Sequence, residues 1–497
     1  MKFRIFLSVA AIVAATGQLH AQYATDALRF SQMDYGSTAR FKGMGGAQIG
    51  VGGDLSSLAA NPAGLGLFTR GEFSLTPEFN NYSTDASYLG GISNASKDQL
   101  NLAHAGAVWN FPVYRRKGED LQTGWLSYSA GIGYSRTNDF NNQILFRGTN
   151  PSSSIADFFA DQATANFGDP NTLTTGSLEG MAYEDYLIDY ENNAYVPVTR
   201  FNNNQNRSET RGGSQSEVNF ALGANYSNKF YLGASLNLST LKYTSDAEYT
   251  ETGIADIQDN QVFNAYDYAL TYRQNQITDG DGVNGKIGAI YRPVESVRLG
   301  LTFQTPTYYN INDSYAEVLN TRYTPGLPTP PVGNDQQIYD FSYRLRTPAK
   351  VSAGASFFFG TSGFISADLD YVDYSKINFS TKGNVDAATI AENNQAVRDS
   401  YQSAVNYRIG GEYRLDQMTL RAGYGLRGNP YRNENREIST YSGGIGYRFS
   451  SFYLDVSYQH NSYDSEIRPY VMANGAEPVA AIDNKRNNVF LTLGARF

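Results

Sequence analysis

The segment Asn487–Phe497, N-N-V-F-L-T-L-G-A-R-F, alternates strictly between two sets of positions. Successive side chains of a β-strand point to opposite faces, so alternate residues share a face. One face carries Val489, Leu491, Leu493, Ala495 and Phe497, and the other carries Phe490, Thr492, Gly494 and Arg496. The pattern predicts a half-apolar strand that ends on an aromatic residue.

A strand of this kind resembles the closing strand of bacterial outer-membrane β-barrels, in which one face meets lipid and the other meets the lumen. The composition agrees, because 38 Tyr and 28 Phe can supply aromatic girdles. The mean hydropathy of −0.43 does not contradict a barrel, since each membrane strand is only half apolar. Beyond the N-terminus, the chain has no apolar run long enough for a membrane helix.

The N-terminus predicts export. M-K-F-R is followed by an apolar run over Ile5–Ala15 and then by the small residue Ala21. This is typical of a secretory signal peptide over residues 1–21, cleaved after Ala21. The chain has no Cys, which excludes disulfides and a lipid-anchored N-terminal Cys. The net charge of −9 argues against nucleic acid as a partner.

Alternating segments separated by Gly and Pro turns predict an all-β fold, a 14-stranded antiparallel transmembrane β-barrel. Short connections alternate with long ones, as periplasmic turns alternate with extracellular loops. Residues 260–276 could extend a strand above the membrane, or form an additional pair that raises the number of strands to sixteen. The predicted strands span 71–82, 99–113, 123–140, 216–228, 229–246, 282–292, 295–311, 338–359, 363–380, 400–414, 417–428, 438–450, 452–464 and 485–497.

The longest predicted loops of the barrel region, 71–497, are 141–214 and 247–281. Ser154–Asp157 reads as a capping box that starts a short helix. Long loops are usually functional or disordered, and exposed apolar patches often mark binding sites. We therefore expect an extracellular hydrophobic groove, although the same side chains could simply pack on one another or on the barrel rim. The groove candidates are Phe158, Phe159, Met181 and Leu187.

Residues 22–70 do not alternate and are rich in glycine. A phosphate-binding loop is excluded, because no G-K-[ST] follows and no strand–turn–helix frame surrounds the glycines. Small residues allow close backbone packing inside a barrel, and a fourteen-stranded barrel is too wide for wall side chains to fill. We therefore predict an N-terminal hatch that plugs the lumen.

Several motifs together resemble the long-chain fatty-acid outer-membrane transporter family, which includes toluene-type hydrocarbon channels. They are D-A-L-R-F-S (Asp26–Ser31), A-R-F-K-G-M-G-G-A (Ala39–Ala47), G-G-D-L-S-S-L-A-A-N-P-A-G-L (Gly52–Leu65), R-T-P-A-K-V-S-A-G (Arg346–Gly354) and D-L-D-Y-V-D-Y-S (Asp368–Ser375). The N-terminal motifs are similar to the version found in Bacteroidetes-type bacteria. The resemblance extends over essentially the whole chain after the signal peptide, except for the long loops.

The resemblance implies a hatch, a low-affinity groove on the extracellular loops, a tighter site in the lumen and a lateral gap where the third strand kinks inward. The residues Gly131 and Gly133 are the kink candidates, although tight packing would equally explain them. No basic residue matches an anchor for a fatty carboxylate, which leaves acid and neutral cargo open. The hatch motif is Asn61, Pro62 and Ala63, and the lumenal candidates are Ile49, Val51, Leu55 and Leu58.

The expected function is passive uptake of hydrophobic compounds, first of all long-chain fatty acids, by a multi-pass protein of the bacterial outer membrane. The alternative is a barrel that serves haem uptake or acts as a protein-secretion partner. An enzyme is not expected, because His104 and His460 belong to no catalytic motif. We expect no metal or cofactor, a monomer, and contacts with a fatty acid or hydrocarbon, outer-membrane lipid and lipopolysaccharide.

Overall fold

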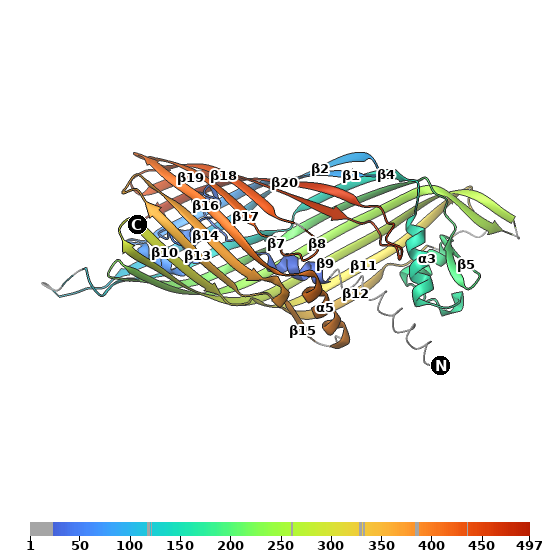
Figure 1. Cartoon of the computed structure of the whole chain (residues 1–497), viewed down its shortest axis with the longest axis horizontal. Helices are drawn as coiled ribbons and strands as arrows, with labels where there is room; N and C mark the ends of the chain where they lie inside the picture. The colour runs from blue at the N-terminus through green and yellow to red at the C-terminus, as the bar shows by residue number, and fades with distance from the viewer. Residues whose placement is uncertain are drawn as a thin grey trace.

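The computed structural model describes residues 23–497 except 117–119, 121, 260–261, 328–330, 332, 383–386 and 435. The predicted signal peptide and its cleavage after Ala21 lie outside the described residues. The chain forms a closed antiparallel β-barrel, and an N-terminal segment lies inside it (Figure 1).

The barrel closes where β1 (Glu72–Tyr88) pairs with β20 (Ala480–Arg496) on one side and with β2 (Gly91–Pro112) on the other. Around the wall, each further segment pairs antiparallel with segments of the preceding and the following strand. The other wall segments are β3 (Trp125–Asp139), β4 (Asn142–Asn150), β7 (Asn203–Tyr226), β8 (Phe230–Asp259), β9 (Val262–Val294), β10 (Val297–Gln304), β11 (Tyr308–Thr324), β12 (Gln337–Arg346), β13 (Lys350–Phe358), β14 (Gly363–Asp373), β15 (Asn378–Thr381), β16 (Ser403–Leu415), β17 (Met418–Arg427), β18 (Ile438–Arg448) and β19 (Phe452–Ile467).

Four wall strands are interrupted and carry two labels each, namely β3 with β4, β10 with β11, β13 with β12, and β14 with β15. The 18 labelled segments therefore form the 14 strands that the sequence predicts. The additional pair at 260–276 does not form, because residues 262–276 belong to β9 and pair with β8 and β11.

The predicted loop 247–281 is mostly strand, since β8 runs to Asp259 and β9 starts at Val262. The predicted loop 141–214 likewise begins with β4 and ends within β7. In the extended part of β8 the outward positions are mostly polar, for example Glu248, Thr250 and Thr252. The apolar positions, such as Ala247, Tyr249 and Ala255, face inwards instead, so the outward apolar face that identified the other strands is missing there.

The barrel is apolar outside and polar inside. Leu232, Leu236 and Leu238 of β8 are about half exposed. Asn237 and Ser239, the residues on either side of Leu238, are buried. Such an arrangement matches a barrel surrounded by hydrocarbon. Among the described residues, no helix is both long enough and apolar enough to cross a membrane.

The breaks in adjacent strands lie at one level of the wall. Pro306 lies between β10 and β11, and Pro348 lies between β13 and β12, where Gln304 faces Lys350 and Tyr308 faces Arg346. Proline has no N–H to donate to a ladder, which explains both breaks. The next strand is interrupted at the same level by the 3₁₀ helix η4 (Tyr374–Lys376).

A helix completes the wall beside the short segment β15. Helix α5 (Ala387–Ser400) brings the Asn394 side chain to the backbone of Phe379. Asn394 Oδ1 accepts from the Phe379 N–H at 2.7 Å, and its Nδ2 donates to the Phe379 carbonyl at 3.0 Å. This side-chain amide occupies the place of a neighbouring strand, which leaves the Phe379 peptide groups satisfied.

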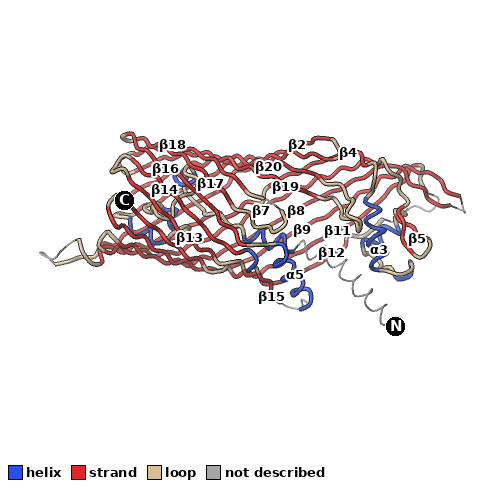
Figure 2. The backbone as a smooth tube through the Cα atoms, viewed as in Figure 1, coloured by secondary structure: helices blue, strands red, loops and turns tan. Residues whose placement is uncertain are grey.

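Most connections at the end of the barrel where the C-terminus lies are tight turns, although β2 and β3 are joined there by a longer one. At the other end β1 and β2 are joined by Leu89 and Gly90 alone, and the longest connection leads from β4 to β7. The cap, which we define as residues 151–202, lies at this other end and contains short helices (Figure 2). Its elements are α3 (Ile155–Asn166), η3 (Pro170–Thr172), α4 (Leu178–Glu184), β5 (Ile188–Glu191) and β6 (Ala194–Pro197). The predicted capping box is confirmed, since the Ser154 N–H donates to Asp157 Oδ2 at 2.8 Å.

The hatch, residues 23–70 in the described part, lies inside the barrel against glycines of the wall. It contains a helix over 23–31, α2 (Ala39–Lys42), η1 (Leu55–Leu58) and η2 (Pro62–Leu67). A Cβ on Gly300 would lie 2.2 Å from the Ile49 carbonyl oxygen, and one on Gly233 would lie 2.2 Å from the Pro62 carbonyl carbon. The wall glycines in such close contact with the hatch are Gly223, Gly233, Gly288, Gly300, Gly354, Gly410 and Gly423.

The hatch also needs glycine for its own path. Gly45 and Gly46 have φ values of 65° and 83°, and Gly52 and Gly53 have values of 61° and 69°. These lie in the left-handed region that residues with a Cβ adopt only with strain. The paired glycines of the G-M-G-G and V-G-G-D sequences therefore form the bends of the hatch.

Charged side chains fix the hatch to the wall. Asp368 of β14 accepts the N–H groups of Gln48 and Ile49 at 2.6 and 2.9 Å. Arg40 of the hatch donates twice to Glu412 of β16, at 2.8 and 3.0 Å. Two wall strands thus hold the hatch through bonds that each involve a charged group.

We predict that Gly423→Ala destabilises the protein by about 1–3 kcal/mol, the usual range for overpacking. The added Cβ would lie 2.1 Å from the Met44 carbonyl carbon, which is backbone and cannot rotate away. The matched control is Gly425→Ala in the same strand, where the nearest atom is 3.5 Å away. Urea unfolding of the purified proteins, followed by heat-modifiable gel migration, measures both. Equal stability of the two variants would contradict the close fit.

Candidate functional site

A cavity of about 430 Å³ lies between the hatch and the barrel wall. Hatch residues between Thr25 and Gly46 form one side, and β1–β4 with β16–β20 contribute most of the other. The cavity reaches the end of β3, because Arg136–Phe140 line it together with Ala103 of β2.

The cavity concentrates positive charge in a chain whose net charge is −9. Clefts lined by an excess of one charge attract ligands of the opposite sign. The cationic residues in the lining are Arg29, Lys42, Arg136, Arg211, Arg408, Arg427, Arg436 and Arg486, and the acidic ones are Asp34, Glu78, Asp139, Asp370 and Glu466.

All seven arginines of the lining have a carboxylate partner, which sets them apart from Lys42. Arg408 lies 2.6 Å from Asp370, and Arg427 is paired with Asp34. Among the described residues Lys42 has no ion-pair partner, and its ammonium lies 5.3 Å from the centre of the Phe490 ring. The cavity therefore retains positive charge that an anionic group could neutralise. The sequence offered no signal for it, because these cations come from strands and a hatch that only the fold brings together.

The third strand, which consists of β3 and β4, separates from β2 part of the way along the wall. The ladder between β2 and β3 joins only His104–Pro112 to Ser127–Ser135. The chain then turns at Phe140 and Asn141, and β4 continues the pairing with β7. Side chains of β1 contact β4 directly, since Thr84 donates to the Gln143 carbonyl at 2.8 Å.

Asp139 fixes this kink. Its carboxylate accepts from Asn80 of β1 at 2.6 Å and from the Asn141 N–H at 3.0 Å. It also lies 3.0 Å from Arg136 and 3.1 Å from Arg486 of β20. The turn is thus held to the wall on its inner side.

The kink leaves part of β2 without a partner. Within the described residues, no ladder joins Gly91–Ala103 of β2 to β3 or β4, although this stretch pairs with β1 throughout, apart from Ala103 at a β-bulge. We call Gly91–Ala103 the free edge of β2. It begins directly beside the cavity-lining residues Ala103 and Arg136.

The kink does not lie at Gly131 and Gly133, as the sequence led us to expect. Both glycines are in a regular ladder, with Gly131 opposite Val108 and Gly133 opposite Gly106. A Cβ on either would lie 2.7 Å from a methyl group of Leu58 in the hatch. They form a notch for the hatch, and the irregular part of the strand follows at residues 136–141.

The hatch motif lies at a contact between hatch and wall. Asn61 Oδ1 accepts the Ala63 N–H at 3.1 Å and caps η2, which begins at Pro62. Asn61 Nδ2 donates to the Ile49 carbonyl at 2.8 Å. Asn61 therefore caps the helix, Pro62 is suited to the first position of a helix, and Ala63 is small enough to pack against the wall.

The lumenal candidates are buried and do not line the cavity. Ile49 packs with Tyr35 and Ala60. The other candidates have similar surroundings, with Val51 in a cluster around Phe41 and Met44, and with Leu55 and Leu58 in a cluster around Leu65, Val108 and Ala221. These side chains join the hatch to itself and to the wall.

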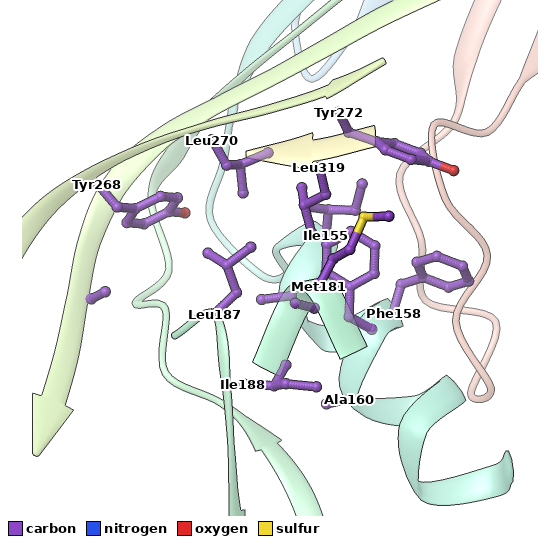
Figure 3. Packing of buried hydrophobic residues seen from close by; sticks show 14 of the residues in the cluster. Ile155, Phe158, Ala160, Met181, Leu187, Ile188, Tyr268, Leu270, Tyr272 and Leu319 are labelled. Atoms are coloured by element: carbon purple, nitrogen blue, oxygen red, sulfur yellow. The ribbon is translucent and has the colours of Figure 1, made fainter. Parts of the chain in front are cut away.

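The groove candidates are buried within the cap. Phe158 is 8% exposed, and Phe159, Met181 and Leu187 are fully buried. They pack with the barrel-rim residues Leu270 and Tyr272 of β9 and Leu319 of β11 (Figure 3). The structure places them in a core between cap and rim, the packing that the sequence left open as an alternative.

A buried carboxylate on β8 anchors the cap. Glu251 accepts from Tyr249 at 2.6 Å, from Tyr268 at 2.7 Å and from the Ile155 N–H at 3.2 Å. It therefore joins the start of α3 to the β8–β9 sheet. Sequence reasoning missed Glu251 because it lies in what looked like a loop.

The two histidines of the described residues lie on different strands, β2 and β19. His104 is buried in β2, and His460 Nδ1 lies 2.8 Å from Asn487 Oδ1. Within the described part of the chain, no group of three His, Asp or Glu residues is placed to hold a metal ion.

Asp185 makes the cap sensitive to pH. Burial raises the pKa of this carboxyl to about 7, against hydrogen bonds that include one from Asn334 Nδ2 at 3.0 Å. In the unfolded chain the group titrates near its ordinary value of 3.8. The folded cap thus favours the protonated form, and its stability falls as the pH rises from about 4 towards 7.

We predict that amide hydrogen exchange in Leu178–Ile188 becomes several-fold faster relative to the intrinsic rate between pH 5.5 and pH 8. Asp185→Asn removes the titration and should abolish this pH dependence. Exchange of the same peptide by mass spectrometry, corrected for intrinsic rates, measures both proteins. A pH dependence that persists in Asp185→Asn would show that another group is responsible.

The sequence and the fold are similar to those of known proteins. Residues 192–467, more than half of the chain, match the protein family described as outer membrane protein transport protein (OMPP1/FadL/TodX). No curated protein matches the sequence.

Two solved structures are similar in fold. A FadL homologue of Pseudomonas aeruginosa matches with a TM-score of 0.54 and 14% identity, over 93% of this chain and 98% of that one. The toluene transporter TodX of Pseudomonas putida matches with a TM-score of 0.52 and 13% identity, over 93% of this chain and 99% of that one.

Proposed function

Because this chain belongs to the outer membrane transport protein family described as OMPP1/FadL/TodX, we propose that it takes up long-chain fatty acids across the bacterial outer membrane. Members of this family are transport channels for hydrophobic compounds rather than enzymes. The cargo enters at the cap, binds in the lumenal cavity and leaves sideways through the wall at the free edge of β2.

The free edge of β2 is the observation that carries this proposal. A closed barrel pairs every strand on both sides, yet Gly91–Ala103 lacks a ladder on the side towards β3. The cavity lies directly beside this edge. Each CH₂ gains about 0.8 kcal/mol on leaving water, so a sideways exit delivers a hydrocarbon chain straight to the bilayer.

The firm attachment of the hatch supports a sideways route over an axial one. An axial route would have to break the Arg40–Glu412 pair and the bonds from Asp368 to the hatch backbone. It would also have to withdraw the hatch from the wall glycines. The sideways route leaves all of these contacts in place.

The charge of the cavity favours an acid over a neutral hydrocarbon. The lining has more cationic than acidic residues, and Lys42 lacks an ion-pair partner among the described residues. A carboxylate would satisfy this charge, whereas a neutral hydrocarbon would leave it unpaired beside apolar atoms, which is costly. Transport needs no energy source, because the gradient and downstream consumption of the acid drive it.

We predict that Ala103→Trp lowers the initial rate of fatty-acid uptake at least several-fold. Ala103 lies between the cavity and the free edge and is almost fully buried, so an indole there obstructs the route. The matched control is Ala107→Trp, at a more exposed position of the same strand outside the cavity lining. Uptake of a labelled long-chain fatty acid by intact cells is measured in a deletion strain that carries each variant.

Wild type and Ala107→Trp should restore uptake to the deletion strain, and Ala103→Trp should not, at equal amounts of folded barrel. Uptake that is unaffected by the deletion would exclude fatty acids as the main cargo. It would favour the alternative of haem uptake or of a protein-secretion partner, which haem uptake and secretion assays in the same strain would separate.

A further inference from the structure

Lys97 spans the free edge of β2. Its ammonium donates to the main-chain carbonyl of Arg211 in β7 at 2.8 Å. Where β3 is paired on both sides, it separates β2 from β7. The bond from Lys97 passes beside the turn between β3 and β4, where this separation ends. A single side chain therefore links two strands that are not neighbours in the sheet.

The position of Lys97 connects the free edge to the cavity. Lys97 lies opposite Tyr82 in the ladder of β1 and β2, and directly opposed residues share a face. Tyr82 lines the cavity, and so does Arg211, whose carbonyl Lys97 binds. The Lys97 side chain thus lies on the lumenal face, at the boundary of the cavity.

Two contacts from β1 to the third strand lie on either side of Lys97. Asn80, opposite Gln99, donates to Asp139 at 2.6 Å, and Thr84, opposite Ala95, donates to the Gln143 carbonyl at 2.8 Å. Among the described residues of the free edge itself, Lys97 is the one whose side chain bonds across the edge.

The bond that Lys97 makes is easily exchanged for a better one. Its acceptor is a neutral carbonyl, and among the described residues Lys97 has no ion-pair partner. A hydrogen bond from an ammonium to a carboxylate is about twice as strong as one between neutral groups. The flexible four-carbon stem of lysine allows the ammonium to turn from one acceptor to the other.

We propose that Lys97 is the exit residue of the channel: it closes the free edge at rest, binds the carboxylate of the departing cargo, and so favours acids over neutral molecules of the same length. This inference rests on the proposed function. The carboxylate would pass from the arginine-lined cavity to Lys97 while the hydrocarbon chain enters the bilayer between β2 and β4.

The test compares a long-chain fatty acid with its methyl ester, which has the same chain but no charge. Initial uptake rates of both labelled compounds are measured in the deletion strain carrying wild type, Lys97→Met, Lys97→Arg or the control Lys242→Met. Lys242 is an exposed lysine of β8 outside the cavity lining. Folded barrel is quantified by heat-modifiable gel migration.

Lys97→Met should lower the ratio of acid to ester uptake about tenfold, the loss expected for one hydrogen bond to a charged group. Lys97→Arg should restore most of the ratio, and Lys242→Met should leave it unchanged. Equal losses of acid and ester would mean that Lys97 is only structural. Unchanged uptake of both would mean that it has no part in exit. Either result would overturn the proposal.

A second measurement does not depend on cargo. Hydrogen exchange of the purified barrel should be faster across Gly91–Ala103 in Lys97→Met than in wild type or Lys97→Arg. Unchanged exchange would contradict the closing role even where uptake changes. If wild type took up neither compound, the proposed function would fail and the exit role with it, while exchange would still decide whether Lys97 closes the edge.

Discussion

A backbone that crosses a hydrocarbon layer must satisfy its N–H and C=O groups within the protein, since each unsatisfied group costs several kcal/mol. The pairing of β1 with β20 meets this demand for the barrel as a whole by removing both edges of the sheet. At β15, where the ladder stops early, the side-chain amide of Asn394 takes over the pairing. Against this background the free edge of β2 is exceptional, because on the side towards β3 neither a strand nor a side-chain amide of the described residues completes it.

The hatch depends on the same closed wall. Its backbone approaches the strands so closely that the wall must present glycine, and charged residues such as Asp368 and Glu412 then fix it. A barrel of this width could be an open pore, but the hatch fills much of it. The cavity lined largely by polar groups lies between the hatch and the strands near the kink.

The cavity and the cap differ in chemistry. The cap buries Phe158, Met181 and Leu187 against the rim, whereas the cavity gathers cations in a chain that is acidic overall. An anionic head group is suited to the cavity, because it can neutralise charge there, whereas the apolar side chains of the cap are used in packing against the rim. The charge of the cavity is the physical basis for proposing a fatty acid rather than a hydrocarbon.

The sequence by itself predicted the barrel, the hatch and the family, and it favoured fourteen strands with sixteen left as an alternative. Period-2 alternation and turn residues are local signals, and they are strong wherever one face of a strand meets hydrocarbon. The same reasoning failed for the distal part of β8, where the outward residues are polar and the alternating apolar residues, such as Tyr249, face inwards. It also left Gly131 and Gly133 open between a kink and tight packing, because a glycine that admits Leu58 and a glycine that breaks a ladder look alike in sequence.

Only the tertiary structure decided where the third strand turns, which charges line the cavity and what closes the wall. Asp139 meets Asn80 and Arg486 across long sequence separations, and Lys97 meets Arg211 past an intervening strand. These contacts depend on the register of strands brought together by barrel closure. No pattern within a single segment encodes them, so the fold could be predicted from the sequence, whereas the details of the site could not.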